Sequence, residues 1–324
     1  MLKPYDFTAY RQSRSLRAAA GSKLQESVPL QCVLFYVVFS LIITLESMPP
    51  AFFYVPELLV QASKDNLDLY DSKAIMDFAM NFKMSTKSML TTLYATGFGT
   101  MLAIIYCTDV EQRPPRSMGF TKRKMLRDSL LGAVFGIALL GGAVLFCWAT
   151  GAVSYAGTAY SGKVGLLCLL LLGWLIQGMS EEVIFRGYFC NSLARKCSPH
   201  LAALLSAIAF ALAHLFNPGK TLLSMPNLIL FGLFAAYFMF RFDSIWGISL
   251  IHAFWNFSQG NLFGISVSGM QSDVSVLRFT ANDGATLIHG GQFGLEGGLG
   301  VTIVLVIGLL LLWFVPERGE KTTS

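Results

Sequence analysis

The stretch Leu166–Phe189, "LLCLLLLGWLIQGMSEEVIFRGYF", joins a run apolar enough for lipid to two glutamates and an arginine. An apolar run of about 20 residues is the length that crosses roughly 30 Å of hydrocarbon as a helix. A charged side chain at the middle of such a helix costs about 2.5–3.5 kcal/mol on insertion scales, so it usually faces a cavity or a partner. The stretch therefore predicts a membrane helix that carries a polar site.

The rest of the chain has the composition of a polytopic membrane protein. It has 324 residues, 54% of them hydrophobic and 13% charged, with a mean hydropathy of +0.57. These values lie well outside those of a soluble globular composition. We predict an all-α, polytopic transmembrane helix bundle with about eight spans, at 29–49, 88–107, 128–150, 162–187, 199–216, 222–241, 244–262 and 298–315.

The basic residues predict the orientation of these spans. They cluster before the first span and between the second and third, at Lys3, Arg11, Arg14, Arg17, Lys23, Arg113, Arg116, Lys122, Arg123, Lys124 and Arg127. The positive-inside rule makes both segments cytoplasmic, and eight spans place both termini on that side. The net charge of +5 then serves orientation and contact with anionic lipid, and no interleaving of basic and aromatic residues suggests nucleic acid.

The chain divides into four predicted parts. These are a basic cytoplasmic segment (1–28), N-terminal membrane helices (29–124) with an outer loop (51–87), a membrane core (125–316) and a cytoplasmic tail (317–324). The outer loop could hold a short amphipathic helix. The connection 261–297 is rich in Gly and Ser, which favours an irregular or re-entrant segment packed against the bundle.

The spacing of intramembrane polar groups indicates which of them can meet. The fourth and fifth spans should form an antiparallel hairpin that turns at "RKCSPH", since proline belongs in the first turn of the following helix. Glu181 lies about 16 residues before this turn and His214 about 16 after it. At about 1.5 Å per residue, both lie roughly 24 Å from the turn, so they are predicted to be level.

Helix geometry places the two adjacent glutamates on different faces with different neighbours. Glu182 and Arg186 are spaced i,i+4 and can pair on one face. Glu181 is rotated about 100° away and shares its face with Gln177. The pair is more often structural than catalytic, because a close opposite charge makes a buried group tolerable. Glu181 is left without a cation on its own helix.

Hydrolysis in a water-filled pocket is the chemistry that uses the remaining groups. A desolvated carboxylate can take a proton from water. A histidine can share that proton or bind a metal, and a second histidine with an asparagine amide can donate to an oxyanion. A lone histidine in a membrane helix is more often an interhelical hydrogen-bond partner, but several polar groups converge here. The candidates are Glu181, His214, His252 and Asn256 as catalytic residues, with Glu182 and Arg186 in support.

Three motifs in order carry a resemblance to a known family. They are "EEVIFRG" (EExxxR), "FALAH" (FxxxH) and "HAFWN" (HxxxN), on successive membrane segments. Together they resemble the CPBP family of intramembrane proteases, which groups the type II CAAX prenyl endopeptidases with bacterial relatives linked to bacteriocin processing or self-immunity. The resemblance covers about 125–316. The stretch "WGISLIHAFWN" is more similar to the bacterial branch, which implies a bacterial inner membrane.

The resemblance implies an intramembrane endopeptidase with a cavity that opens from the cytoplasmic leaflet. Glu181 would activate the attacking water with His214, while His252 and Asn256 would stabilise the oxyanion, and the glutamate–arginine pair would hold the site in shape. The substrate would be a peptide or membrane-associated protein, either a prenylated CAAX tail or a bacterial leader or signalling peptide.

A metal is an open alternative for this family. Glu181, His214 and His252 could provide three zinc ligands with one open position. His252 could not then also serve the oxyanion, so we favour the metal-independent arrangement for the chemistry.

Two further classes of function remain open from the sequence. One is a catalytically silent membrane protein that binds a partner, as an immunity factor would. The other is a proton-coupled transporter, for which intramembrane Glu and His are also natural.

Overall fold

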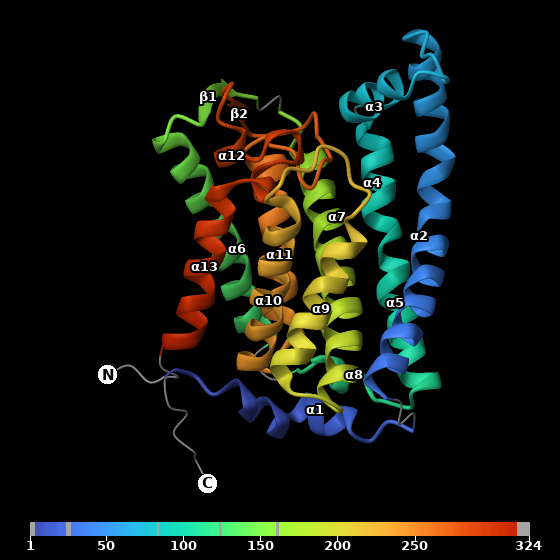
Figure 1. The fold of residues 1–324 in the computed structure, drawn as a ribbon, viewed down its shortest axis with the longest axis vertical. Helices are drawn as coiled ribbons and strands as arrows, with labels where there is room; N and C mark the ends of the chain where they lie inside the picture. Colours follow the sequence, from blue (N-terminus) through green and yellow to red (C-terminus); the bar gives the residue numbers. More distant parts are fainter. Residues whose placement is uncertain (1–3, 24–26, 83, 123–124, 160–161, 316–324) are drawn as a thin grey trace.

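A computed structural model describes residues 4–23, 27–82, 84–122, 125–159 and 162–315. These residues form a bundle of long helices (Figure 1), which confirms the predicted all-α fold. One small sheet was not expected. Its strands β1 (Val153–Thr158) and β2 (Leu277–Ala281) pair antiparallel, with an irregularity in register between Tyr155 and Gly157. The predicted tail at 317–324 lies outside the described residues.

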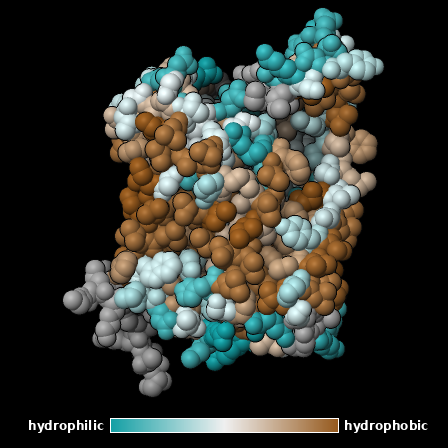
Figure 2. All heavy atoms as spheres, in the orientation of Figure 1, coloured by the Kyte–Doolittle hydropathy of each residue, from teal (hydrophilic) through white to brown (hydrophobic). Residues whose placement is uncertain are grey.

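Long helices occupy all eight predicted windows. They are α2 (Val28–Lys64), α4 (Thr86–Ala95) continued by α5 (Gly97–Ile105), α6 (Met125–Ala149), α7 (Val164–Glu182), α9 (Pro199–Ala213), α10 (Ser224–Phe242), α11 (Ile245–Phe257) and α13 (Leu299–Phe314). Five helical segments are long and apolar enough to cross a membrane, and α9 and α13 are shorter apolar helices. On the face shown in Figure 2, a broad hydrophobic band crosses the middle of the molecule, with hydrophilic residues toward both ends. The chain is an integral membrane protein.

Short elements complete the chain. The helices are α1 (Arg14–Ala19), α3 (Ser72–Asn81), α8 (Asn191–Ala194) and α12 (Thr286–His289). Wider π turns extend three of the spanning helices, at η2 (Tyr106–Val110), η4 (Val183–Cys190) and η5 (Ser258–Leu262). Tighter 3₁₀ turns are η1 (Phe7–Gln12), η3 (Pro115–Met118), η6 (Gly291–Phe293) and η7 (Leu295–Gly297).

The first spanning helix is longer than its predicted window. The prediction ended it at residue 49, whereas α2 continues through Pro49, Pro50 and Pro56 to Lys64. Proline removes a backbone donor, but membrane helices tolerate it where neighbouring groups satisfy the freed carbonyls. Residues 51–64 of the expected outer loop therefore belong to α2, and α3 supplies the short helix expected in the remainder.

The two ends of the bundle differ in charge and in covering structure. One end carries α1, while the other carries α3, α12 and the β1–β2 sheet (Figure 1). We call the first the basic end, because it holds Arg14, Arg17, Arg116, Lys122 and Arg127, and the second the sheet end. The backbone N–H of Tyr5 donates to the carbonyl of Trp313 at 2.7 Å. The N-terminal segment and the end of α13 therefore meet at the basic end.

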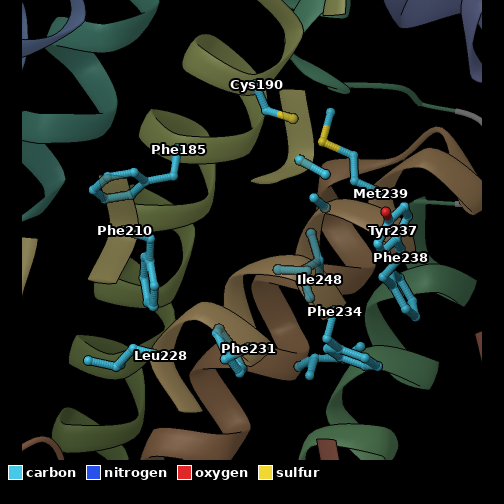
Figure 3. Packing of buried hydrophobic residues seen from close by; sticks show 14 of the residues in the cluster. Phe185, Cys190, Phe210, Leu228, Phe231, Phe234, Tyr237, Phe238, Met239 and Ile248 are labelled. Atoms are coloured by element: carbon cyan, nitrogen blue, oxygen red, sulfur yellow. The ribbon is translucent and has the colours of Figure 1, made fainter. Parts of the chain in front are cut away.

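Close helix contacts hold the elements that carry the predicted site. A Cβ added at Gly178 on α7 would lie 2.8 Å from the backbone nitrogen of Ala253 on α11, so only glycine allows this approach of the two helices. Aromatic packing joins α7 and η4 to α9 and α10. The ring centroid of Phe210 lies 5.4 Å from that of Phe185 and 5.8 Å from that of Phe231 (Figure 3).

The connection 261–297 folds back onto the sheet end of the bundle. Apart from β2 and the four-residue helix α12, its regular structure consists of short turns. Gly294 has a φ of 94°, and a Cβ there would lie 1.9 Å from the carbonyl oxygen of Ser266. This conformation and close approach require glycine. The high Gly content of the segment therefore reflects tight irregular packing.

Candidate active site

All four candidate catalytic residues line one cavity of about 260 Å³. They come from three elements, with Glu181 on α7, His214 at the C-cap of α9, and His252 and Asn256 on α11. Counting residues from the hairpin turn predicted that Glu181 and His214 lie level with each other, and both residues line this cavity. Residues far apart in the sequence thus share one internal space.

Glu182 lies at the centre of a fully buried ion cluster. Its Oε1 is 3.2 Å from the Arg186 guanidinium, on the same face as predicted. The same oxygen accepts a hydrogen bond of 2.8 Å from Nδ1 of His252. The Arg186 guanidinium also sits over the Phe210 ring, 4.5 Å from its centroid. Glu182 therefore joins α7 to α11 and fixes the orientation of the His252 ring.

Glu181 is positioned by a chain of amides. Asn256 Nδ2 donates to Gln177 Oε1 at 3.0 Å, and Gln177 Nε2 donates to Glu181 Oε1 at 2.5 Å. The other carboxylate oxygen, Oε2, has no hydrogen-bond partner among the described residues. It lies 3.6 Å from Nε2 of His252. Glu181 lines the cavity and is thus anchored through one oxygen, while the other has no hydrogen-bond partner among the described residues.

His214 lies where α9 ends. Its Nδ1 is 2.9 Å from the carbonyl oxygen of Phe210, one turn earlier, a carbonyl that can accept only from a protonated Nδ1. The Nε2 atom is then the one available for chemistry. The ring also packs against that of Phe210, with centroids 4.7 Å apart.

Two further carboxylates line the cavity and were not among the predicted site residues. Glu46 comes from α2, and its Oε2 has no hydrogen-bond partner in the described part of the chain. Glu46 lies inside the predicted first span, so the rule that charges in spans mark sites could have found it. An ideal Cβ at Gly99 would lie 2.7 Å from this oxygen, so α5 packs directly against it.

Glu296 enters the cavity from the irregular segment before α13. Its Oε2 accepts 2.7 Å hydrogen bonds from the backbone N–H and the hydroxyl of Ser268. Asn227 on α10 donates to the carbonyl of Glu296 at 2.8 Å and holds the turn in place. Burial raises the pKa of the Glu296 carboxyl. No periodic pattern in the sequence marks this position, because it belongs to no long element.

The side chains do not form a metal site in this arrangement. Among the described residues, no group of three or more His, Cys, Asp or Glu side chains is placed to hold a metal ion. Of the three zinc ligands considered, His252 directs Nδ1 to Glu182 and His214 directs Nδ1 to Phe210. These hydrogen bonds leave Nε2 of each histidine as the atom that a metal would use, but the three side chains are not gathered into a group that could hold an ion among the described residues. The chemistry below is assigned to the protein's own groups.

The cavity lies nearer the sheet end than the basic end. Its lining includes Asn217 and Pro218 from the loop after α9, and Ser268 and Met270 from the irregular segment. These loops lie at the end of the bundle opposite α1 (Figure 1). The expected opening from the cytoplasmic leaflet stays a prediction. The segment that covers the cavity on this side is part of the irregular connection 261–297.

Comparison with known proteins identifies the part of the chain that carries the motifs. Residues 163–258 match the family model described as type II CAAX prenyl endopeptidase Rce1-like. The match contains all three motifs, whereas Glu46 and Glu296 lie outside it. The curated proteins contain no match to the chain. Residues 163–258 are thus similar to the Rce1-like type II CAAX prenyl endopeptidases of the CPBP family.

Proposed function

We propose that this protein is an intramembrane endopeptidase in which Glu181 activates water to hydrolyse a peptide bond near the membrane. The observation that carries the proposal is the asymmetric setting of the Glu181 carboxylate. One oxygen is held by Gln177, while the other has no hydrogen-bond partner among the described residues and lies 3.6 Å from Nε2 of His252. An anchored carboxylate with one free oxygen is the geometry that a general base requires.

The proton steps follow from these positions. Glu181 takes a proton from a water molecule, and the resulting hydroxide attacks the scissile carbonyl carbon. The tetrahedral oxyanion accepts hydrogen bonds from Nε2–H of protonated His252 and from the Asn256 amide hydrogen that does not bond Gln177. Such donors, fixed before the reaction, act most strongly in a site that excludes water.

Collapse of the tetrahedral intermediate breaks the C–N bond. The leaving nitrogen receives the proton that Glu181 took from water, which restores the carboxylate. His214, with Nδ1 held by Phe210, faces the same space through Nε2 and shares that proton. No net proton is gained or lost, and the products are a carboxylic acid and an amine.

Glu182 and Arg186 act as positioning residues. The Glu182 carboxylate accepts from Nδ1 of His252, which sets the ring so that Nε2 points toward Glu181. An acid that fixes a histidine in this way also stabilises its protonated form. Glu181 and Glu182 are carboxylates on adjacent residues and would repel each other if neither were compensated. Arg186 neutralises the charge of Glu182.

The substrate we propose is a peptide segment that reaches the membrane interior. Apolar side chains from α2, including Phe39 and Ile43, line the cavity opposite the polar cluster. Ile43 is 40% exposed, so this wall is continuous with the lipid-facing surface. A prenylated C-terminal tail or a membrane-bound leader peptide would fit such a wall. We place the protein in a bacterial inner membrane with the basic end, and therefore both termini, cytoplasmic.

The decisive test is cleavage of a peptide library by purified protein in detergent, with and without a C-terminal prenyl group. Glu181→Gln should lower turnover by about 10²–10⁴-fold, the range of general base catalysis. Asp283→Asn, the same acid-to-amide change at an exposed loop position, is the control and should keep full turnover.

Three outcomes would contradict the proposal. Full turnover by Glu181→Gln would remove the glutamate from the chemistry. Zinc near one per chain in the wild type, lost together with activity in Glu181→Gln and His214→Gln, would show a metal mechanism. Solute flux into sealed vesicles, with no peptide cleaved by the wild type, would identify a transporter.

A further inference from the structure

A second and larger cavity lies at the basic end, away from the candidate active site. Its volume is about 1400 Å³, above the roughly 300–1,000 Å³ of pockets for drug-sized ligands. Its walls come from α6, α10 and α13, and α1 lies along its rim. No residue lines both cavities. We call this second space the basic groove.

The rim of the basic groove carries a large excess of positive charge. Six basic and two acidic residues line it: Arg14, Arg17, Arg116, Lys122, Arg127, Arg241, Asp128 and Asp243. Asp243 already accepts hydrogen bonds from the backbone N–H groups of Arg14 and Ser15, at 2.9 and 3.3 Å. The Arg241 guanidinium donates to the carbonyls of Leu312 and Val315 and so holds the end of α13.

The remaining basic side chains of the rim are exposed and available. Arg14, Arg17, Arg116, Lys122 and Arg127 form no ion pair with any residue that the structure describes. They reach the groove from three segments, namely α1, the η3 region and the start of α6. Guanidinium groups match the geometry of phosphate oxygens through paired N–H donors. The rim is therefore complementary to an anionic phosphate group.

The walls below this rim are apolar and aromatic. Phe234 and Phe238 project from α10, with ring centroids 6.2 Å apart (Figure 3). Phe135 on α6 and Leu311 on α13 face the same space and are 46% and 48% exposed. Phe234 lies eight residues before the end of α10, which is about 12 Å of helix. The groove thus runs from a charged rim into the hydrophobic band of the molecule.

We propose that the basic groove binds an anionic phospholipid, with its phosphate on the arginine and lysine rim and one acyl chain along α6, α10 and α13. Basic pockets between membrane helices on the cytoplasmic side are the setting in which anionic headgroups bind. A soluble phosphate would use only the rim and would leave the aromatic walls without a partner. The proposal does not depend on the proteolytic function.

Native mass spectrometry of the full-length protein tests the proposal. The protein is released from nanodiscs that contain equal amounts of phosphatidylglycerol and phosphatidylcholine. We expect the wild type to retain phosphatidylglycerol selectively. Arg116→Gln/Lys122→Gln/Arg127→Gln should weaken this retention on the order of 100-fold, since each basic group near the surface contributes about fivefold.

A triple variant at other exposed positions is the matched control. Lys64→Gln/Lys73→Gln/Lys163→Gln removes the same charge from residues outside the groove and should retain phosphatidylglycerol as the wild type does. A thermal melt gives a second readout, because a ligand that binds only the folded state raises Tm. Phosphatidylglycerol should raise the Tm of the wild type and of the control, but not that of the rim variant.

Several results would overturn the proposal. Equal retention of the two lipids by the wild type would remove the selectivity for negative charge. Undiminished retention by the rim variant, or equal loss in both triple variants, would show that the groove is not the site. Displacement of the lipid by millimolar glycerol phosphate would assign the rim to a soluble phosphate.

Discussion

Two buried glutamate–arginine clusters lie in different surroundings. In the active-site cluster, Glu182 meets Arg186 at 3.2 Å. In the other, Glu111 Oε2 lies 2.6 Å from Nε of Arg113 and 3.8 Å from NH2 of Arg195, with the Glu111 and Arg113 side chains at most 1% exposed. The Arg113 guanidinium also donates to Ser192 at 3.0 Å. By burial and ion pairing, the two clusters are alike.

The difference lies in what surrounds each pair. Glu182 also holds His252, and a second carboxylate lies on the adjacent residue and faces a cavity. Glu111 lines neither the active-site cavity nor the basic groove, and its contacts fasten the segment after η2 to α8. A buried ion pair is therefore no mark of a catalytic site by itself. The informative feature is a polar group left over beside the pair.

The largest expected effect on folding comes from the structural cluster. Glu111→Ala leaves Arg113 and Arg195 without their shared counter-charge and should lower the free energy of unfolding by about 3–5 kcal/mol. Peptide turnover per folded molecule should stay at the wild-type level. Unfolding in mixed micelles, followed by tryptophan fluorescence, gives the first quantity, and turnover of the monodisperse fraction gives the second. Reduced turnover in that fraction would make this cluster part of the active site.

In the active-site cluster, a conservative change should lower turnover, which is the quantity that Glu111→Ala leaves unchanged. Glu182→Gln keeps the side-chain shape but removes the carboxylate that orients His252, so kcat should fall on the order of 10²-fold. Glu111→Gln is the matched change in the other cluster and should leave kcat unaltered. Steady-state kinetics of both variants on one peptide makes the comparison. Equal kcat values for the two variants would refute the distinction between the clusters.

A single methyl group can test the helix contact beneath the active site. Gly178→Ala places a Cβ 2.8 Å from the backbone of Ala253, so it should push α7 away from α11. Overpacking of this kind costs about 1–3 kcal/mol, and turnover should fall with it. Gly165→Ala lies on the same helix, where a Cβ would meet nothing within 4 Å. Its thermal stability and turnover should match the wild type.

The smallest effect concerns the pH dependence of stability. Burial raises the pKa of Glu296 above its ordinary value of 4.5, so the folded state favours the protonated acid. This contribution to stability is complete below the unfolded pKa and is lost as the pH rises through the folded pKa. Thermal melts at increasing pH should show this loss in the wild type. Glu296→Gln should lack it, and an unchanged pH profile would contradict the assignment.

The sequence predicts the helices and the four candidate catalytic residues that line the cavity, for reasons that can be named. Because charged side chains are costly to insert into a membrane, the sequence shows where the apolar spans lie and which charges within them are unusual. The rise per residue of a helix then predicts that Glu181 and His214 are level. The same rule applied to the first span would have selected Glu46. The link from Glu182 to His252 could not be predicted, because it depends on the lateral packing of α7 on α11 and not on spacing within either helix.

The irregular character of the segment 261–297 was predicted from its glycines, but its detailed course at the sheet end could not be. Glu296 and Ser268 meet through an irregular segment whose course is set by glycines with unusual dihedral angles and by contacts with the bundle. Neither hydrophobic periodicity nor motif spacing encodes such a path. The β1–β2 pairing joins segments more than 100 residues apart, which no local pattern in either strand reveals.

The composite origin of the cavity has a consequence for how enzymes of this kind diverge. The three motifs lie within residues 163–258, but Glu46 and Glu296 enter from stretches before and after that range. The proposed reacting groups and part of the enclosing walls are thus encoded in separate parts of the chain. Substitutions in the walls can change which peptide is admitted while the motifs stay fixed, so proteins that share the same chemistry can acquire unrelated substrates.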